Sequence, residues 1–205
     1  MNLAILASIV ALSILIGVSR FKDRKTAGKQ QSDFWAMERK ANGTRRKSLE
    51  YLNYISIPLD QLPLTVMAED EKVADYVRII RELSTCKIVN FTGITNTELK
   101  LRYGAPNIDL LSSYDQNYTV LARTLQQWGQ LLSDNGYLTE ACQVLEFAIS
   151  TGTDVSGTYK LLCQIYHLQN TPEKIGFLYP IAETLPESRR NAIVRILQES
   201  GKSYD

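Results

Sequence analysis

The sequence predicts a mostly α-helical protein. It would consist of a transmembrane helix at the amino terminus, a helical domain built from two helix-turn-helix units, and a C-terminal capping helix. Three observations support this prediction. Apolar residues recur at alternating spacings of three and four from Tyr118 onward, which places them on one face of an α-helix. The pattern restarts after 34 residues, and the residues before Ser19 are almost all apolar.

The first unit begins at Tyr118. Its first helix carries one apolar stripe, formed by Tyr118, Leu121, Leu125, Trp128 and Leu132. Asn135-Gly136 supplies the turn, because glycine tolerates the left-handed conformation that ends a helix. The second helix of the unit carries the stripe Leu138, Ala141, Leu145 and Ala148.

The second unit follows Thr151-Gly152-Thr153-Asp154. Its first stripe is Tyr159, Leu162 and Tyr166, and after a break at Asn170-Thr171-Pro172 its second stripe is Ile175, Leu178, Ala182 and Leu185. Ile193, Ile196 and Leu197 follow Pro186 and predict a helix that closes the array.

The two units superpose with one constant shift. Leu125 matches Tyr159, Trp128 matches Leu162, Leu132 matches Tyr166 and Ala148 matches Ala182, each 34 residues apart. This is the length of a tetratricopeptide repeat. The first unit resembles that family at Leu125, Trp128-Gly129, Leu132, Gly136-Tyr137, Ala141, Leu145 and Ala148. The second departs from it at Cys163 and Ile175, and Thr153 stands where a proline would commonly close the first unit, so an unrelated antiparallel helical bundle is the alternative.

The resemblance implies a protein-binding surface. In tetratricopeptide repeats the first helix of each unit lines the surface that receives a partner. The corresponding positions in this sequence are Arg123, Gln126, Gln130 and Asp134 in the first unit and Lys160, Gln164 and His167 in the second. The alternative is that these side chains are only solvated, as on the outer face of any helix.

Residues 1–19 predict the transmembrane anchor. The run from Leu3 to Val18 approaches the length that spans a bilayer. A cleaved signal peptide would carry basic residues before its apolar core, and a buried core helix would show a polar face. Here the basic residues follow the apolar run, so the amino terminus is expected outside the cell membrane and the helical domain in the cytoplasm.

A basic segment, residues 20–47, follows the anchor. It carries a net charge of +7, whereas the rest of the chain carries −6 and the whole chain +1. Beside a membrane span this charge favours anionic lipid headgroups over nucleic acid. The residues expected at the membrane surface are Arg20, Lys22, Arg24, Lys25 and Lys29.

Residues 48–117 are expected to form a helical and irregular region that packs on the repeats at 118–205. Thr44 is expected to begin a short helix through Leu52, and Ile57 to Leu64 to form an extended connector. Glu69-Asp70-Glu71 opens a helix, and Thr95 with Glu98 matches a capping box. The residues between Cys86 and Ser113 form either a binding loop or a well-capped connector.

The sequence offers little for catalysis. His167 is the only histidine, and the three cysteines show no metal-binding spacing. Cys163 and His167 lie four residues apart on one expected helix, but they would supply only half of a metal site. We therefore expect no catalytic residues, metal or cofactor. The expected function is a membrane-tethered adaptor that binds a protein partner and does not bind nucleic acid. The alternatives are an accessory subunit of a membrane complex and a membrane-associated enzyme.

Overall fold

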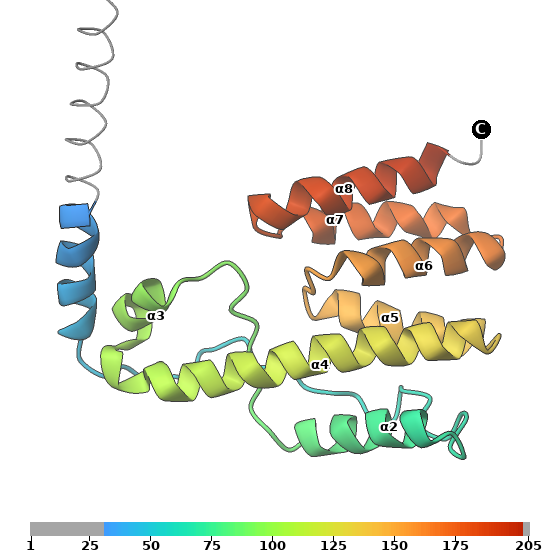
Figure 1. Ribbon diagram of the computed structural model, residues 1–205, viewed down its shortest axis with the longest axis horizontal. Helices are drawn as coiled ribbons and strands as arrows, with labels where there is room; N and C mark the ends of the chain where they lie inside the picture. The colour runs from blue at the N-terminus through green and yellow to red at the C-terminus, as the bar shows by residue number, and fades with distance from the viewer. Residues whose placement is uncertain (1–30, 203–205) are drawn as a thin grey trace, which may run out of the picture. The chain divides into compact units, whose positions relative to one another are not determined.

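The computed structural model describes residues 31–202 and consists of two compact units. One unit comprises residues 31–47 and Thr95–Ile108. The other comprises Ser48–Ile94 and residues 109–202. All the regular elements of the described residues are helical (Figure 1). The mostly α-helical part of the predicted fold class is therefore confirmed.

The smaller unit contains a helix over residues 31–42, α3 (Asn96–Tyr103) and the short 3₁₀ helix η1 (Ala105–Asn107). The buried side chain of Asn107 donates hydrogen bonds to the carbonyls of Lys47 and Tyr103, at 2.9 and 2.8 Å. The second bond gives a partner to the carbonyl of the last residue of α3. The first holds in place the segment that follows the helix over residues 31–42. The short helix expected from Thr44 is absent, because the Thr44 hydroxyl instead bonds back to the Lys40 carbonyl.

The larger unit contains the remaining helices. They are α2 (Glu71–Leu83), α4 (Ile108–Asp134, of which Ile108 belongs to the smaller unit), α5 (Leu138–Ser150), α6 (Ser156–Leu168), the 3₁₀ helix η2 (Pro172–Phe177), α7 (Leu178–Glu183) and α8 (Glu187–Lys202). One hydrophobic core joins them, from Ile57 to Leu197. Ile57 and Leu62 belong to this core, so the expected extended connector packs on the helices rather than lying free in solvent.

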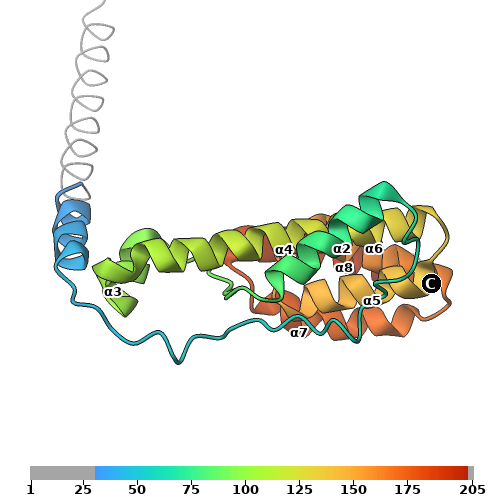
Figure 2. The same cartoon turned by 90° about the horizontal axis from the view of Figure 1, so that it is seen from below.

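Helices α5 to α8 lie one above another in the larger unit (Figure 1), and in the view from below they overlap (Figure 2). Helix α6 packs against α5 and α8, and α7 packs against α8. The close approach expected at Gly129 is present, because a Cβ atom added there would lie 2.6 Å from Leu145 Cδ2 of α5. Two boundaries differ from expectation. Helix α4 begins ahead of Tyr118, and the helix expected over Ile175 to Leu185 is divided into η2 and α7.

The predicted transmembrane helix and single-pass location in the cell membrane need correction. No helix within residues 31–202 is both long and apolar enough to cross a bilayer. The longest of them, α4, has 27 residues, but polar side chains occupy its outer face. The expected anchor at residues 1–19 lies outside the described residues, as do Arg20, Lys22, Arg24, Lys25 and Lys29. A transmembrane helix and a membrane location are therefore not proposed for this protein.

Candidate functional site

The structure places the expected partner-binding residues on α4 and α6. Four of them are exposed, namely Arg123, Asp134, Lys160 and Gln164, and three are partly buried, namely Gln126, Gln130 and His167. Gln126 of α4 faces the start of α6, since its Nε2 atom would lie 3.6 Å from a Cβ atom added at Gly157. The two helices therefore approach each other at Gln126.

Three of these residues are engaged within the fold. Gln130 donates a hydrogen bond to the carboxylate of Asp134, one turn along α4, at 2.7 Å. His167 Nε2 lies 3.0 Å from the carbonyl of Ser200 in α8. The imidazole thereby links α6 to the closing helix.

A pocket of about 310 Å³ lies beside α4 in the larger unit. Six of its lining residues come from one face of α4, namely Asp115, Tyr118, Thr119, Ala122, Arg123 and Gln126. Asp154 and Val155, just before α6, and Thr92 complete the lining. The pocket therefore contains Arg123 and Gln126 from the expected set, and adds two carboxylates that the sequence did not indicate. We refer to this pocket as the α4 groove.

Tyr118 is the most buried polar side chain of the α4 groove, with 4% of its surface exposed. Its hydroxyl is inaccessible to solvent and lies near the side chains of Thr151, Thr153 and Asn90, none of which lines the α4 groove. Burial raises the pKa of Tyr118 to about 12, and the charge of the Asp154 carboxylate adds to this rise. Hydrogen bonding with the side chains of Thr151 and Thr153 lowers the same pKa, but by less than burial raises it. Tyr118 is therefore a neutral phenol that can still donate and accept a hydrogen bond.

No protein-family model, curated protein or solved structure matches this chain. The resemblance to tetratricopeptide repeats therefore stays a prediction, based on the period and the positions quoted above.

A second pocket of the larger unit, of about 490 Å³, is lined mostly by polar groups of loops. Asn90 is one of them, and its amide donates hydrogen bonds to the carbonyls of Thr151 and Gly152, at 3.1 and 2.9 Å. Its side-chain oxygen accepts from the backbone N–H of Thr92. The polar capacity of Asn90 is thus used to hold its loop against the turn between α5 and α6, as a capped connector does.

Two of the three thiols are poorly placed for nucleophilic chemistry. Cys142 and Cys163 are buried, and burial raises the pKa of both, that of Cys142 to about 12. The carboxylate of Glu146, which accepts the Cys142 thiol at 3.3 Å, adds to that rise. Within residues 31–202 no group of three metal-ligating side chains comes together.

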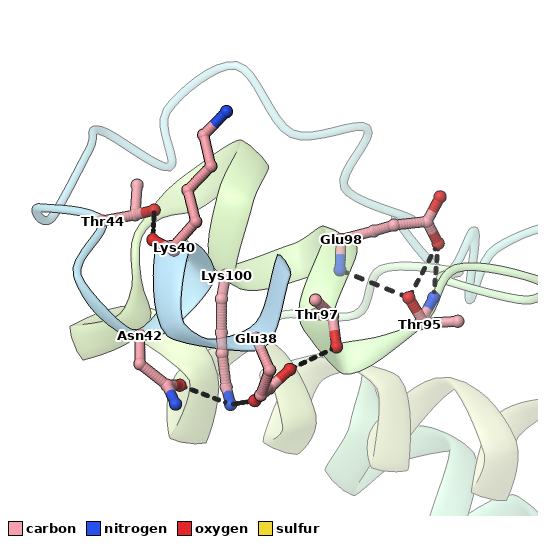
Figure 3. A network of polar contacts seen from close by, with 8 residues as sticks. All are labelled: Glu38, Lys40, Asn42, Thr44, Thr95, Thr97, Glu98 and Lys100. Carbon is pink, nitrogen blue, oxygen red and sulfur yellow. Dashed lines mark hydrogen bonds and ion pairs between the residues drawn. The ribbon is translucent and has the colours of Figure 1, made fainter. Parts of the chain in front are cut away.

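The smaller unit has a polar network of its own (Figure 3). Glu38 forms an ion pair with Lys100 of α3 and accepts a hydrogen bond from Thr97, and Lys100 also donates to the Asn42 side chain at 2.8 Å. The Thr95–Glu98 capping box predicted from the sequence is confirmed at the start of α3. The network joins the helix over residues 31–42 to α3, so we regard it as structural.

Proposed function

We propose that this chain is a non-catalytic adaptor that binds a protein partner through the surface formed by α4 and α6. The α4 groove is the observation that carries the proposal, because it contains Arg123 and Gln126 of the expected binding set. Several recurring modes of peptide recognition place a segment of the protein partner in a groove.

Two further features support the proposal. The helices after α4 stack in the order expected for paired repeats, with α8 closing the array against α6 and α7. Lys160 and Gln164 of α6 are exposed and therefore accessible to a partner. In a tetratricopeptide-like array the first helices of successive units provide one continuous surface, and these residues lie on such a helix.

The test compares partner capture by two variants of the tagged full-length chain after cross-linking in cells. The surface variant is Gln126→Ala in the α4 groove with Lys160→Ala on the exposed face of α6. The control is Gln143→Ala with Gln198→Ala, which truncates exposed side chains on α5 and α8. We expect the surface variant to lose a specific partner that the wild type and the control retain, with unchanged circular dichroism. Equal capture by all three proteins would contradict the proposal.

A further inference from the structure

A third pocket of the larger unit is lined by residues of α5, α6, η2 and α7 and has a volume of about 260 Å³. Most of its lining is apolar and includes Ile149 of α5 and Leu178 and Ile181 of α7. We refer to it as the α7 pocket. It shares no residue with the α4 groove or with the expected partner-binding set, so an occupant of the α7 pocket would leave those residues free.

An aromatic side chain stands exposed at this pocket. Phe177, the last residue of η2, belongs to the lining and is nevertheless 74% exposed, whereas Leu178 beside it is buried. A phenyl ring has no polar atom, so water gains no hydrogen bond from its exposure. Covering the ring removes apolar surface from water, which is favourable. The same face therefore carries a protruding apolar side chain and an apolar pocket next to it.

Two charged side chains of the pocket have unused hydrogen-bonding capacity. Glu146 Oε1 accepts the Tyr166 hydroxyl at 2.9 Å and the Cys142 thiol at 3.3 Å. Lys174 Nζ lies 3.9 Å from the same oxygen, which is too far for a hydrogen bond. Because these contacts converge on Oε1, Oε2 of Glu146 and the ammonium of Lys174 remain able to bond to a group from outside. Both side chains are more than 40% exposed.

Size and charge together indicate what fits the α7 pocket. Its volume lies below the roughly 300–1,000 Å³ of small-molecule sites, so the pocket suits a single side chain better than a free ligand. Its one carboxylate and one ammonium give no net charge that would select an acidic or a basic partner. A face with one charge of each sign is instead complementary to itself.

A two-fold axis beside the α7 pocket would use all of these features at once. In a two-fold dimer the same patch of both copies meets, and each contact occurs twice. The rotation brings Phe177 of one copy over the pocket of the other. It also brings the Lys174 of one copy toward the Glu146 of the other.

We propose that the α7 pocket receives the Phe177 side chain of a second copy of this chain, in a two-fold dimer with Lys174 of each copy paired to Glu146 of the other. One phenyl ring buries about 150–250 Å², and a standard interface buries about 800 Å² per partner, so the dimer is weak and reversible. The inference does not depend on the proposed function. In that function, the dimer would present two copies of the α4 and α6 surface and so raise avidity for a multivalent partner.

The first test is sedimentation of the full-length chain at concentrations from about 1 μM to about 1 mM, the range in which weak complexes form. We expect a reversible monomer–dimer equilibrium. Phe177→Ala should raise its dissociation constant about 100-fold, because two rings are lost per dimer and each is worth about tenfold. The circular dichroism of the variant should match the wild type, since the ring is exposed.

The matched control is Leu168→Ala at the end of α6, which truncates another large apolar side chain, 66% exposed, outside the α7 pocket. It should leave the dissociation constant unchanged. A chain that stays monomeric throughout the range, or that associates equally well without the Phe177 ring, would overturn the proposal. So would equal weakening by both substitutions, since that would indicate unspecific apolar attraction.

A second measurement locates the contact. The photoreactive p-azidophenylalanine replaces Phe177, and equal amounts of unlabelled and isotope-labelled chain are mixed and irradiated. We expect cross-linked peptides that join residue 177 of one isotope form to the segment around Ile149 or Ile181 of the other. A lack of such mixed peptides, or mixed peptides that join residue 177 to another surface, would reject the proposed interface.

Discussion

Gly129 lies where α4 and α5 approach closely, and a Cβ atom there would lie within 2.7 Å of both Cγ and Cδ2 of Leu145. Leu145 is completely buried, so its side chain can move aside only if its neighbours in the core move as well. We expect Gly129→Ala to lower the free energy of unfolding by about 1–3 kcal/mol through overpacking. This should exceed the gain of about 1 kcal/mol in helix propensity.

Gly157→Ala is the matched control in α6, because its Cβ atom would meet only the Gln126 side chain, at ordinary van der Waals distance. It should be neutral or slightly stabilising. Urea denaturation followed by circular dichroism measures both variants. An alanine at position 129 that left the midpoint unchanged would show that Leu145 can repack.

The three cysteines differ in accessibility, which predicts their reactivity. Cys86 is exposed, whereas Cys142 and Cys163 are buried. With its pKa raised to about 12, the Cys142 thiol stays protonated through the range in which thiol reagents are used. We expect Ellman's reagent to modify Cys86 rapidly in the native protein and all three cysteines in denaturant. Equal rates for Cys86 and Cys142 would contradict the buried position of Cys142.

At the level of elements, two helix-start signals in the sequence were reliable, whereas the prediction of a helix beginning at Thr44 was wrong. Thr95 and Glu98 form the predicted capping box, and Asp70 accepts the N–H groups of Lys72 and Val73 at the start of α2. Such caps depend on residues only two or three positions apart, which is why the sequence is sufficient to predict them.

Element boundaries were less predictable where tertiary packing overrides local preference. Helix α4 begins at Ile108, although Ser112-Ser113 and Asn117 have low helix propensity, because Leu111 and Tyr118 are buried on one face. The helix expected over Ile175 to Leu185 begins as the 3₁₀ helix η2, with Pro172 in its first turn, where a missing N–H is tolerated, and α-helical geometry starts only at Leu178. Asp115 and Asp154 were missed for a related reason, since no local pattern indicates that residues distant in the sequence will share a groove.

The ion pair between Glu38 and Lys100 joins two elements of the smaller unit and predicts a pH dependence. Hydrogen bonds from Lys100, and to a lesser extent from Thr97, hold the pKa of Glu38 below its ordinary value of 4.5. A carboxyl group with a lowered pKa in the folded state stabilises that state above its unfolded pKa. That contribution is lost as the pH falls through the folded pKa.

Amide hydrogen exchange over residues 31–42 measures this effect. We expect the wild type to be more protected than Glu38→Gln at neutral pH, and the ratio of their exchange rates to approach one as the pH falls well below 4.5. Lys100→Met should remove the same pH dependence and raise the pKa of Glu38 toward its ordinary value. A ratio that did not change with pH would mean that the ion pair contributes nothing.

At the scale of the whole molecule, the expected repeat units and the observed core imply different unfolding behaviour. A repeat array is stabilised mainly by contacts between neighbours, and its units can unfold separately. In the larger unit, however, one hydrophobic core includes both Trp128 of α4 and Leu197 of α8. With so few units, we expect the core to unfold as a single cooperative structure.

Leu197→Ala tests this expectation from one end of the stack. Leu197 is completely buried, so the truncation should lower the free energy of unfolding by about 2–5 kcal/mol.

In a Trp35→Phe background, Trp128 is the remaining tryptophan and is itself completely buried, so its fluorescence reports on α4. If the larger unit is cooperative, Leu197→Ala will lower the Trp128 midpoint, whereas Gln198→Ala on the exposed face of α8 will not. If α8 instead unfolds separately, helicity will be lost first and the Trp128 midpoint will stay at its wild-type value. The protein would then behave as a repeat array despite its shared core.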